Sequence, residues 1–160
     1  MTSRRTARAF SLLEVVLVLA LIGIVAAIAV PRHASALARY RAESAARRIA
    51  ADLEYARSLA ESSSSHQIIV FDTAADTYTL VGRSDPDDPG QTYTVVLDES
   101  PYHATLAAAG FGGTAKVAFD GFGMPSAGGA VQIQVGPYAY TVSVDAESGA
   151  VSVSTATGVP

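Results

Sequence analysis

The feature that most constrains this chain is a run of apolar residues near its N-terminus. From Phe10 to Val30 every residue is apolar or small except Ser11 and Glu14. A helix rises about 1.5 Å per residue, so these roughly 21 residues extend for about 30 Å, the thickness of the hydrocarbon core of a bilayer. The run is therefore long enough to cross a membrane as a single helix.

Glu14 is the exception inside this run. A carboxylate at the centre of a membrane helix costs roughly 2.5 kcal/mol or more, and a position one turn from the positive helix start lowers that cost. An ionisable residue in such a segment is by default a functional candidate with a charged partner. The alternative is that the Glu14 side chain only reaches out to the lipid headgroups.

The residues that flank Glu14 form a specific pattern. A basic head precedes Ala9 and Phe10, Glu14 is the fifth residue counted from Phe10, and Pro31 ends the apolar run; the basic residues are Arg4, Arg5 and Arg8. This arrangement resembles the N-terminal signal of type IV pilins and pseudopilins, although Ala9 stands where that family usually has glycine. The resemblance implies that a prepilin peptidase cleaves between Ala9 and Phe10 and methylates the new amino group of Phe10. It also implies that the apolar helices pack as the core of a filament.

The position of Glu14 has a physical explanation within that resemblance. Cleavage before Phe10 creates a positive amino group at the start of a buried helix, and a buried ammonium group needs an opposite charge. Glu14 of a neighbouring subunit can supply it, so we predict inter-subunit charge pairing at Glu14. Subunit contacts that do not close into a ring produce an open helical filament.

An ordinary secretory signal peptide is the alternative for this segment, because Ala27-Ile28-Ala29 would pass as a cleavage site. Glu14, the length of the apolar run and the helical pattern that follows it favour retention of the segment. The basic head favours a cytoplasmic N-terminus by the positive-inside rule.

A second helical pattern follows Pro31, which lacks a backbone N–H and is predicted to kink the helix. Apolar residues recur at spacings of three and four and predict one buried stripe, with Arg48, Asp52 and the other charged residues mostly off it. The stripe comprises Ala42, Ala46, Ile49, Leu53, Ala56 and Ala60. The serines from Ser62 to Ser65 are predicted to end the helix, because they favour turns.

From residue 67 the pattern changes to the alternation of half-buried strands. Residues 104–109 are readable either as a short strand or as a helical turn, with Gly110, Gly112 and Gly113 ending it. The other predicted strands are 67–72, 77–81, 92–97, 116–119, 131–135, 138–144 and 151–154. Strands that follow one long helix predict an α+β, type IV pilin-like fold with an antiparallel sheet or two small sheets.

The chain is thus expected to contain four segments. Residues 1–9 are the cleaved leader, 10–30 the transmembrane and filament-core helix, 31–61 the amphipathic half of the long helix, and 66–160 a β-rich globular pseudopilin domain.

Composition narrows the function further. The net charge is −4 and no lysine or arginine follows Lys116, so a large cationic surface for nucleic acid is not expected on the globular part. The absence of cysteine excludes disulfides and cysteine zinc sites. We therefore expect neither a cofactor nor a catalytic site. The histidines match no metal-ligand spacing; they are His33, His66 and His103.

One acidic loop is ambiguous. Asp85 precedes Pro86, and Asp87 and Asp88 lie between Pro86 and Pro89; oxygen-rich loops of this kind can bind calcium. A solvated turn is the interpretation that we favour.

The C-terminal part resembles a particular branch of the same family, the GspH/FimT-type domain. The segments that carry this resemblance are 56–60, 117–123, 140–144 and 148–151. It implies an H-type minor pseudopilin, a structural subunit that assists assembly of the type II secretion pseudopilus and protein export across the outer membrane. Such a protein is not an enzyme; it sits in the inner membrane with its globular domain in the periplasm, and enters the pseudopilus on assembly.

The partners implied by this resemblance are other pseudopilins through the N-terminal helix, the prepilin peptidase, an inner-membrane assembly platform and secreted cargo. The alternative is a FimT-like minor type IV pilin that acts in pilus biogenesis or DNA uptake. The lack of basic residues after Lys116 counts against DNA capture. An envelope enzyme with a lone anchor has no catalytic constellation to support it.

Overall fold

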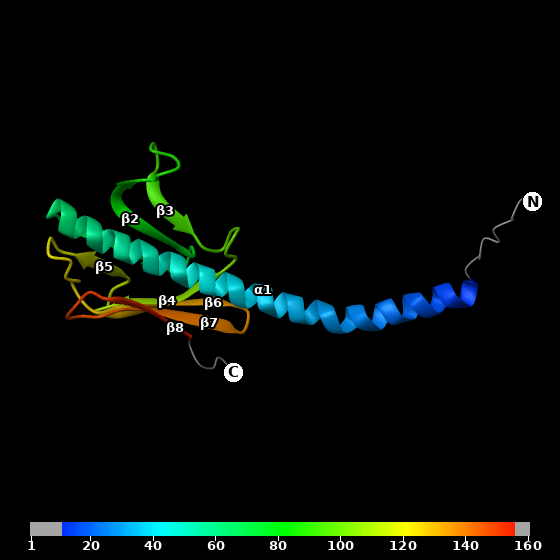
Figure 1. The fold of residues 1–160 in the computed structure, drawn as a ribbon. Helices are drawn as coiled ribbons and strands as arrows, with labels where there is room; N and C mark the ends of the chain where they lie inside the picture. Colours follow the sequence, from blue (N-terminus) through cyan, green and yellow to red (C-terminus); the bar gives the residue numbers. More distant parts are fainter. Residues whose placement is uncertain (1–10, 156–160) are drawn as a thin grey trace, which may run out of the picture. The chain divides into compact units, whose positions relative to one another are not determined.

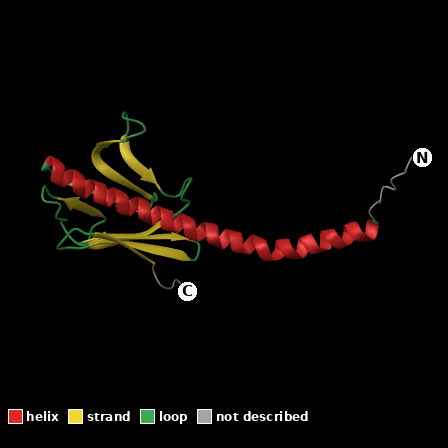
Figure 2. Ribbon diagram, viewed as in Figure 1, coloured by secondary structure: helices red, strands yellow, loops and turns green. Residues whose placement is uncertain are grey.

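The computed structural model describes residues 11–155, except for the side chains of residues 27–33. One long helix, α1 (Leu12–Ser63), precedes eight strands (Figures 1 and 2). The chain divides into two compact units, Met1–Leu37 and Ala38–Pro160, and α1 runs through the division. The helix ends within the predicted serine cluster, as the turn preference of serine requires.

The strands form two antiparallel sheets of four strands each, in the orders β3-β2-β1-β5 and β4-β6-β7-β8. Their bounds are β1 (Gln67–Asp72), β2 (Thr77–Ser84), β3 (Thr92–Val96), β4 (Thr105–Phe111), β5 (Lys116–Phe119), β6 (Gly129–Val135), β7 (Tyr138–Val144) and β8 (Val151–Thr155). The predicted α+β, pilin-like fold is therefore confirmed, and it contains two small sheets rather than one.

Of residues 104–109, which the sequence left open, all but Ala104 belong to strand β4. The strand pairs with β6 and continues through Gly110, which aligns with Ala130. The prediction that Gly110 ends this element was wrong. Pairing with β6 supplies the backbone hydrogen bonds that keep Gly110 extended, and the turn comes two residues later, where Gly112 has a φ of 56°.

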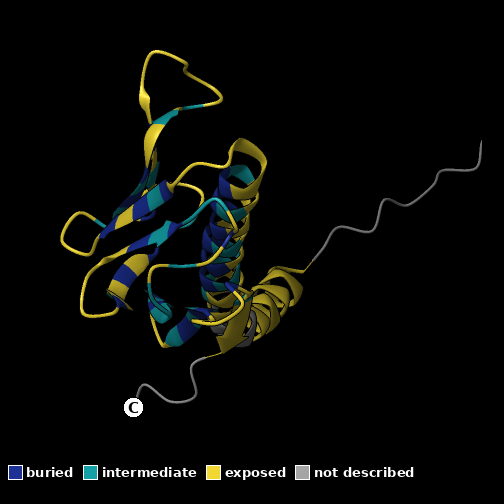
Figure 3. Cartoon of the chain, turned by 90° about the vertical axis from the view of Figure 1, so that its left-hand side faces the viewer, coloured by how far each residue is buried: buried dark blue, intermediate teal, exposed yellow. Residues whose placement is uncertain are grey.

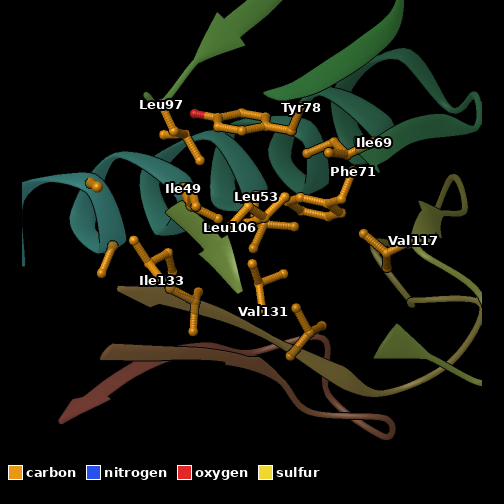
Figure 4. Packing of buried hydrophobic residues seen from close by; sticks show 14 of the residues in the cluster. Ile49, Leu53, Ile69, Phe71, Tyr78, Leu97, Leu106, Val117, Val131 and Ile133 are labelled. Atoms are coloured by element: carbon orange, nitrogen blue, oxygen red, sulfur yellow. The ribbon is translucent and has the colours of Figure 1, made fainter. Parts of the chain in front are cut away.

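The core lies between the second half of α1 and the two sheets (Figures 3 and 4). All six residues of the predicted helical stripe are buried, and the stripe is confirmed. Ile49 and Leu53 point among the side chains of both sheets (Figure 4). Phe71 of β1 joins the sheets, because its ring lies 5.7 Å from that of Phe111 in β4. The helix and both sheets thus share one hydrophobic core.

Candidate functional site

The first half of α1 presents apolar side chains that its own unit does not cover. Every residue from Ser11 to Ala26 is exposed, and Leu12 retains 84% and Leu17 60% of its accessible surface. A face this apolar is the mark of a surface that contacts another protein or lipid. Among residues 11–26, Glu14 is the only charged residue.

The start of α1 is capped locally. The Ser11 hydroxyl accepts a hydrogen bond from the backbone N–H of Leu13 at 3.3 Å, and the Ser11 carbonyl accepts one from Val15 at 3.2 Å. A serine in this position satisfies donors that a helix start leaves unpaired. The cap fixes Glu14 in the first turn, where the positive end of the helix dipole favours its negative charge.

The Glu14 carboxylate is exposed and makes no hydrogen bond or ion pair within the part of the chain that the structure describes. It is therefore free for the inter-subunit pairing predicted from the sequence. The predicted cleavage and methylation residues, Ala9 and Phe10, lie outside the described residues, as does the leader.

Pro31 lies inside α1, which is assigned as helix on both sides of it. Its side chain is outside the described part, so the predicted kink stays a prediction. Within the residues described, no helix combines the length and mean hydropathy of a membrane span.

The sequence did not identify one polar cluster in the second half of α1. Asp52 was expected to lie off the buried stripe, and this expectation was wrong, because only 7% of its surface is exposed. Its carboxylate accepts hydrogen bonds from the Tyr78 hydroxyl at 2.5 Å and the Tyr93 hydroxyl at 2.9 Å. It also accepts one from Nε of Arg48 at 3.0 Å. A buried carboxylate is tolerated when its oxygens are satisfied in this way.

Burial and the charge of Asp52 together keep the phenols of this cluster protonated. Burial, followed by the charge of Asp52, raises the pKa of Tyr78 far above its usual value. Burial and the hydrogen bond to Asp52 raise the pKa of Tyr93 to about 12. Burial disfavours the charged form of Arg48, but the nearby Asp52 outweighs this, and the pKa of Arg48 is raised. Both phenols therefore stay protonated at neutral pH and donate to Asp52, which ties α1 to β2 and β3.

The acidic loop between β2 and β3 is held by hydrogen bonds among its own residues. Asp85 Oδ1 accepts hydrogen bonds from the backbone N–H groups of Asp87 at 2.8 Å and Asp88 at 3.4 Å. The Asp88 carboxylate accepts hydrogen bonds from the backbone N–H of Gly90 at 3.2 Å and from the side-chain amide of Gln91 at 3.1 Å. Among the described residues, no group of three or more acidic, histidine or cysteine side chains is arranged to hold a metal ion. The carboxylates of the loop shape a solvated turn.

A long helix with an uncovered apolar first half, whose second half packs on antiparallel sheets, defines the type IV pilin-like class of proteins. Two crystal forms of the type IV minor pilin FimU from Pseudomonas aeruginosa share this fold, with TM-scores of 0.52 and 0.51. Each is 14% identical to this chain; the alignments cover 76% and 74% of this chain and 97% and 99% of the FimU chain. At this identity the likeness concerns the fold.

Comparison with known families is more specific. The prokaryotic N-terminal methylation motif matches residues 4–30, and the family of type II transport protein GspH matches residues 45–149. This chain belongs to the GspH family, and the predicted resemblance is confirmed. A search of curated proteins found no match.

Membership in this family indicates a minor pseudopilin of type II secretion, and a minor type IV pilin remains compatible with the fold. The family consists of membrane-anchored structural subunits. The methylation motif implies processing by a prepilin peptidase and assembly with other pilin-like subunits.

Proposed function

We propose that this chain is a minor pseudopilin that is trimmed at Ala9–Phe10, methylated at Phe10 and assembled into a pseudopilus through the exposed half of α1. The observation that carries the proposal is the uncovered apolar stretch from Leu12 to Ala26, with one unpaired carboxylate in its first turn. Before assembly this half of the helix anchors the protein in the inner membrane, with the globular unit in the periplasm. Its role is structural rather than enzymatic.

In the filament the same side chains bury against the helices of neighbouring subunits. Keeping apolar surface out of water is worth roughly 25 cal/mol per Å² in the membrane and in the filament alike, so the transfer between these two apolar environments has little net cost. Glu14 then pairs with the amino group of Phe10 in an adjacent subunit. This pair favours one vertical register, because a displaced neighbour leaves a buried charge unpaired.

The finer partners follow from this role. Other pseudopilins contact the N-terminal helix. The peptidase and the inner-membrane assembly platform act on the membrane form of the protein. Secreted cargo could contact the globular unit only in the periplasm.

DNA is not proposed as a partner. Of the arginines on the packed half of α1, Arg47 and Arg48 are already paired with Glu43 and Asp52, and no basic residue follows Lys116.

The N-terminus of the native protein tests this proposal. We expect intact-mass and peptide mass spectrometry to show a chain that begins at N-methylated Phe10. A strain without the peptidase provides the control and should retain the leader. A chain that keeps Met1 in the wild-type strain, or that begins near Val30, would contradict the proposal.

A further inference from the structure

Basic and acidic residues are divided unevenly along the part of the chain that follows the apolar run. Residues 32–59 carry six arginines and three acids, whereas residues 60–160 carry two basic residues and eleven acids. An anionic membrane surface attracts the first of these segments and repels the second. The first segment is also the one that directly follows the apolar run, and so the one that a membrane-anchored chain holds next to the bilayer.

Two arginines of this segment are not neutralised within the described part of the chain. Arg47 and Arg48 each form an ion pair with an acid four residues away, at 2.7 and 3.0 Å. Arg41, by contrast, forms no hydrogen bond or ion pair there. Arg39 interacts first with the Tyr140 hydroxyl, and none of the ion pairs in that part of the chain includes it. Arg39 and Arg41 therefore keep positive charges that an anion from outside the chain can bind.

A strongly exposed tyrosine lies between these two arginines. Tyr40 keeps 68% of its accessible surface. Tyr102, from the β3–β4 connection, lines the same surface hollow as Tyr40 and adds a second phenol beside α1. Tyrosine is enriched at the boundary between a bilayer and water, because its ring is apolar and its hydroxyl is polar. Arg39, Tyr40, Arg41 and Tyr102 together form what we term the collar of the globular unit.

The collar lies close enough to the bilayer to interact with its headgroups. Tyr40 follows Val30, the end of the apolar run, by ten residues, so at most about 15 Å of helix separates them. Helical side chains lean back over the preceding turn, which brings the charged groups closer by roughly 5 Å. The headgroups extend about 5–8 Å beyond the hydrocarbon core, and their charge acts over a Debye length of about 8 Å more. Both arginines thus lie within the attraction of anionic headgroups.

We propose that the collar binds anionic phospholipid headgroups on the periplasmic face of the inner membrane. The guanidinium groups of Arg39 and Arg41 bind lipid phosphates, which match the planar fork of arginine, and Tyr40 lies at the level of the headgroups. This inference rests on the proposed function, because it concerns the membrane-anchored form that precedes assembly. It adds that the arginine-bearing end of the globular unit is held against the bilayer until the subunit enters the filament.

Tryptophan fluorescence tests this contact, because the native sequence has no tryptophan. The full chain with Tyr40→Trp is reconstituted in lipid nanodiscs that contain phosphatidylcholine or phosphatidylglycerol with a nitroxide at the headgroup end of the acyl chain. The matched control is Tyr55→Trp, which replaces a tyrosine that is 52% exposed and lies about 22 Å further along α1. We expect the nitroxide to quench the emission of Tyr40→Trp and to leave that of Tyr55→Trp nearly unchanged.

The choice between the two lipids reports the role of the arginines. One arginine close to an anionic surface contributes about a fivefold preference, so labelled phosphatidylglycerol should quench Tyr40→Trp at a several-fold lower mole fraction than labelled phosphatidylcholine. Adding Arg41→Gln should reduce that ratio about fivefold. The exposed Lys116→Gln is the charge-matched control and should leave the ratio unchanged. Salt at about 1 M should abolish the preference, because it shortens the Debye length to about 3 Å.

The inference is overturned if Tyr40→Trp is quenched no more than Tyr55→Trp. It is also overturned if the two lipids quench Tyr40→Trp equally, a result that would leave the arginines to an acidic protein partner. Leader cleavage and filament incorporation of the native chain are scored separately. Cleavage and incorporation without a lipid preference reject this contact and leave the proposed function standing. A lipid preference without cleavage supports the contact and counts against that function.

Discussion

Asp52 shows how a single polar residue can connect the helix to a sheet. Three donors from α1, β2 and β3 converge on its carboxylate, at distances between 2.5 and 3.0 Å. Removing one partner of such a group leaves the others desolvated and unsatisfied, which costs more than the bond itself contributes. The cluster therefore fixes the β2–β3 hairpin on α1.

We expect Asp52→Ala to lower the free energy of unfolding by about 3 kcal/mol or more, because it leaves two phenols and the Arg48 charge without their acceptor. Denaturant unfolding measured by circular dichroism reports this change. The exposed Asp87→Asn serves as a control and should stay within about 0.5 kcal/mol of the native chain. An Asp52→Ala variant as stable as that control would show that the cluster does not hold the hairpin.

The burial of Asp52 could have been predicted from its spacing in the sequence. It lies three residues after Ile49 and four before Ala56, both of which belong to the buried stripe. Its residue type argued against burial, because aspartate is rarely buried unless it is paired. The partners, Tyr78 and Tyr93, are 26 and 41 residues away, and a single sequence does not show such pairings.

At the level of elements, most strands were predictable because their apolar residues alternate. Val131 and Ile133 of β6, for example, are fully buried, while Gln132 between them is not. The exception is β4, where alanine favours helix and gives little alternation. Its conformation is decided by pairing with β6, a contact with a distant segment. The order of the strands depends on the same kind of contact, since β1 pairs with β5 rather than with β3.

The pairing of β4 with β6 gives a prediction about two glycines. A Cβ atom at Gly129 would lie 2.1 Å from the carbonyl oxygen of Gly110, whereas a Cβ atom at Gly110 would meet nothing within 4 Å. We expect Gly129→Ala to destabilise the chain by about 1–3 kcal/mol, as overpacked sites do.

Gly110, on the neighbouring strand β4, provides the control for this prediction. Gly110→Ala should change the free energy of unfolding by less than about 1 kcal/mol, because its Cβ has room. Thermal unfolding of the two variants, measured side by side, compares their melting temperatures and tests this prediction. Equal melting temperatures would mean that the two strands can separate to admit a methyl group at Gly129.

On the scale of the whole molecule, the two parts of the chain differ in whether their apolar residues are buried. The unit from Ala38 onward buries its apolar residues in one core, whereas the exposed part of α1 leaves its leucines and valines uncovered. This contrast was readable in the sequence, because a stripe predicts packing on a sheet and an unbroken apolar run predicts burial in something else. What the run packs against could come only from the family resemblance, since no contact within the described residues identifies it.

The role of Glu14 is the central claim, and the distribution of the chain between membrane and sheared filament fractions tests it most directly. Glu14→Gln keeps the size of the side chain and removes its charge, with Glu147→Gln on an exposed turn of the globular unit as the matched control. We predict that Glu14→Gln is cleaved normally but that its share in the filament fraction falls about tenfold or more, because the buried amino group of a neighbour loses its counter-charge. Equal incorporation of Glu14→Gln and the native chain would contradict the account.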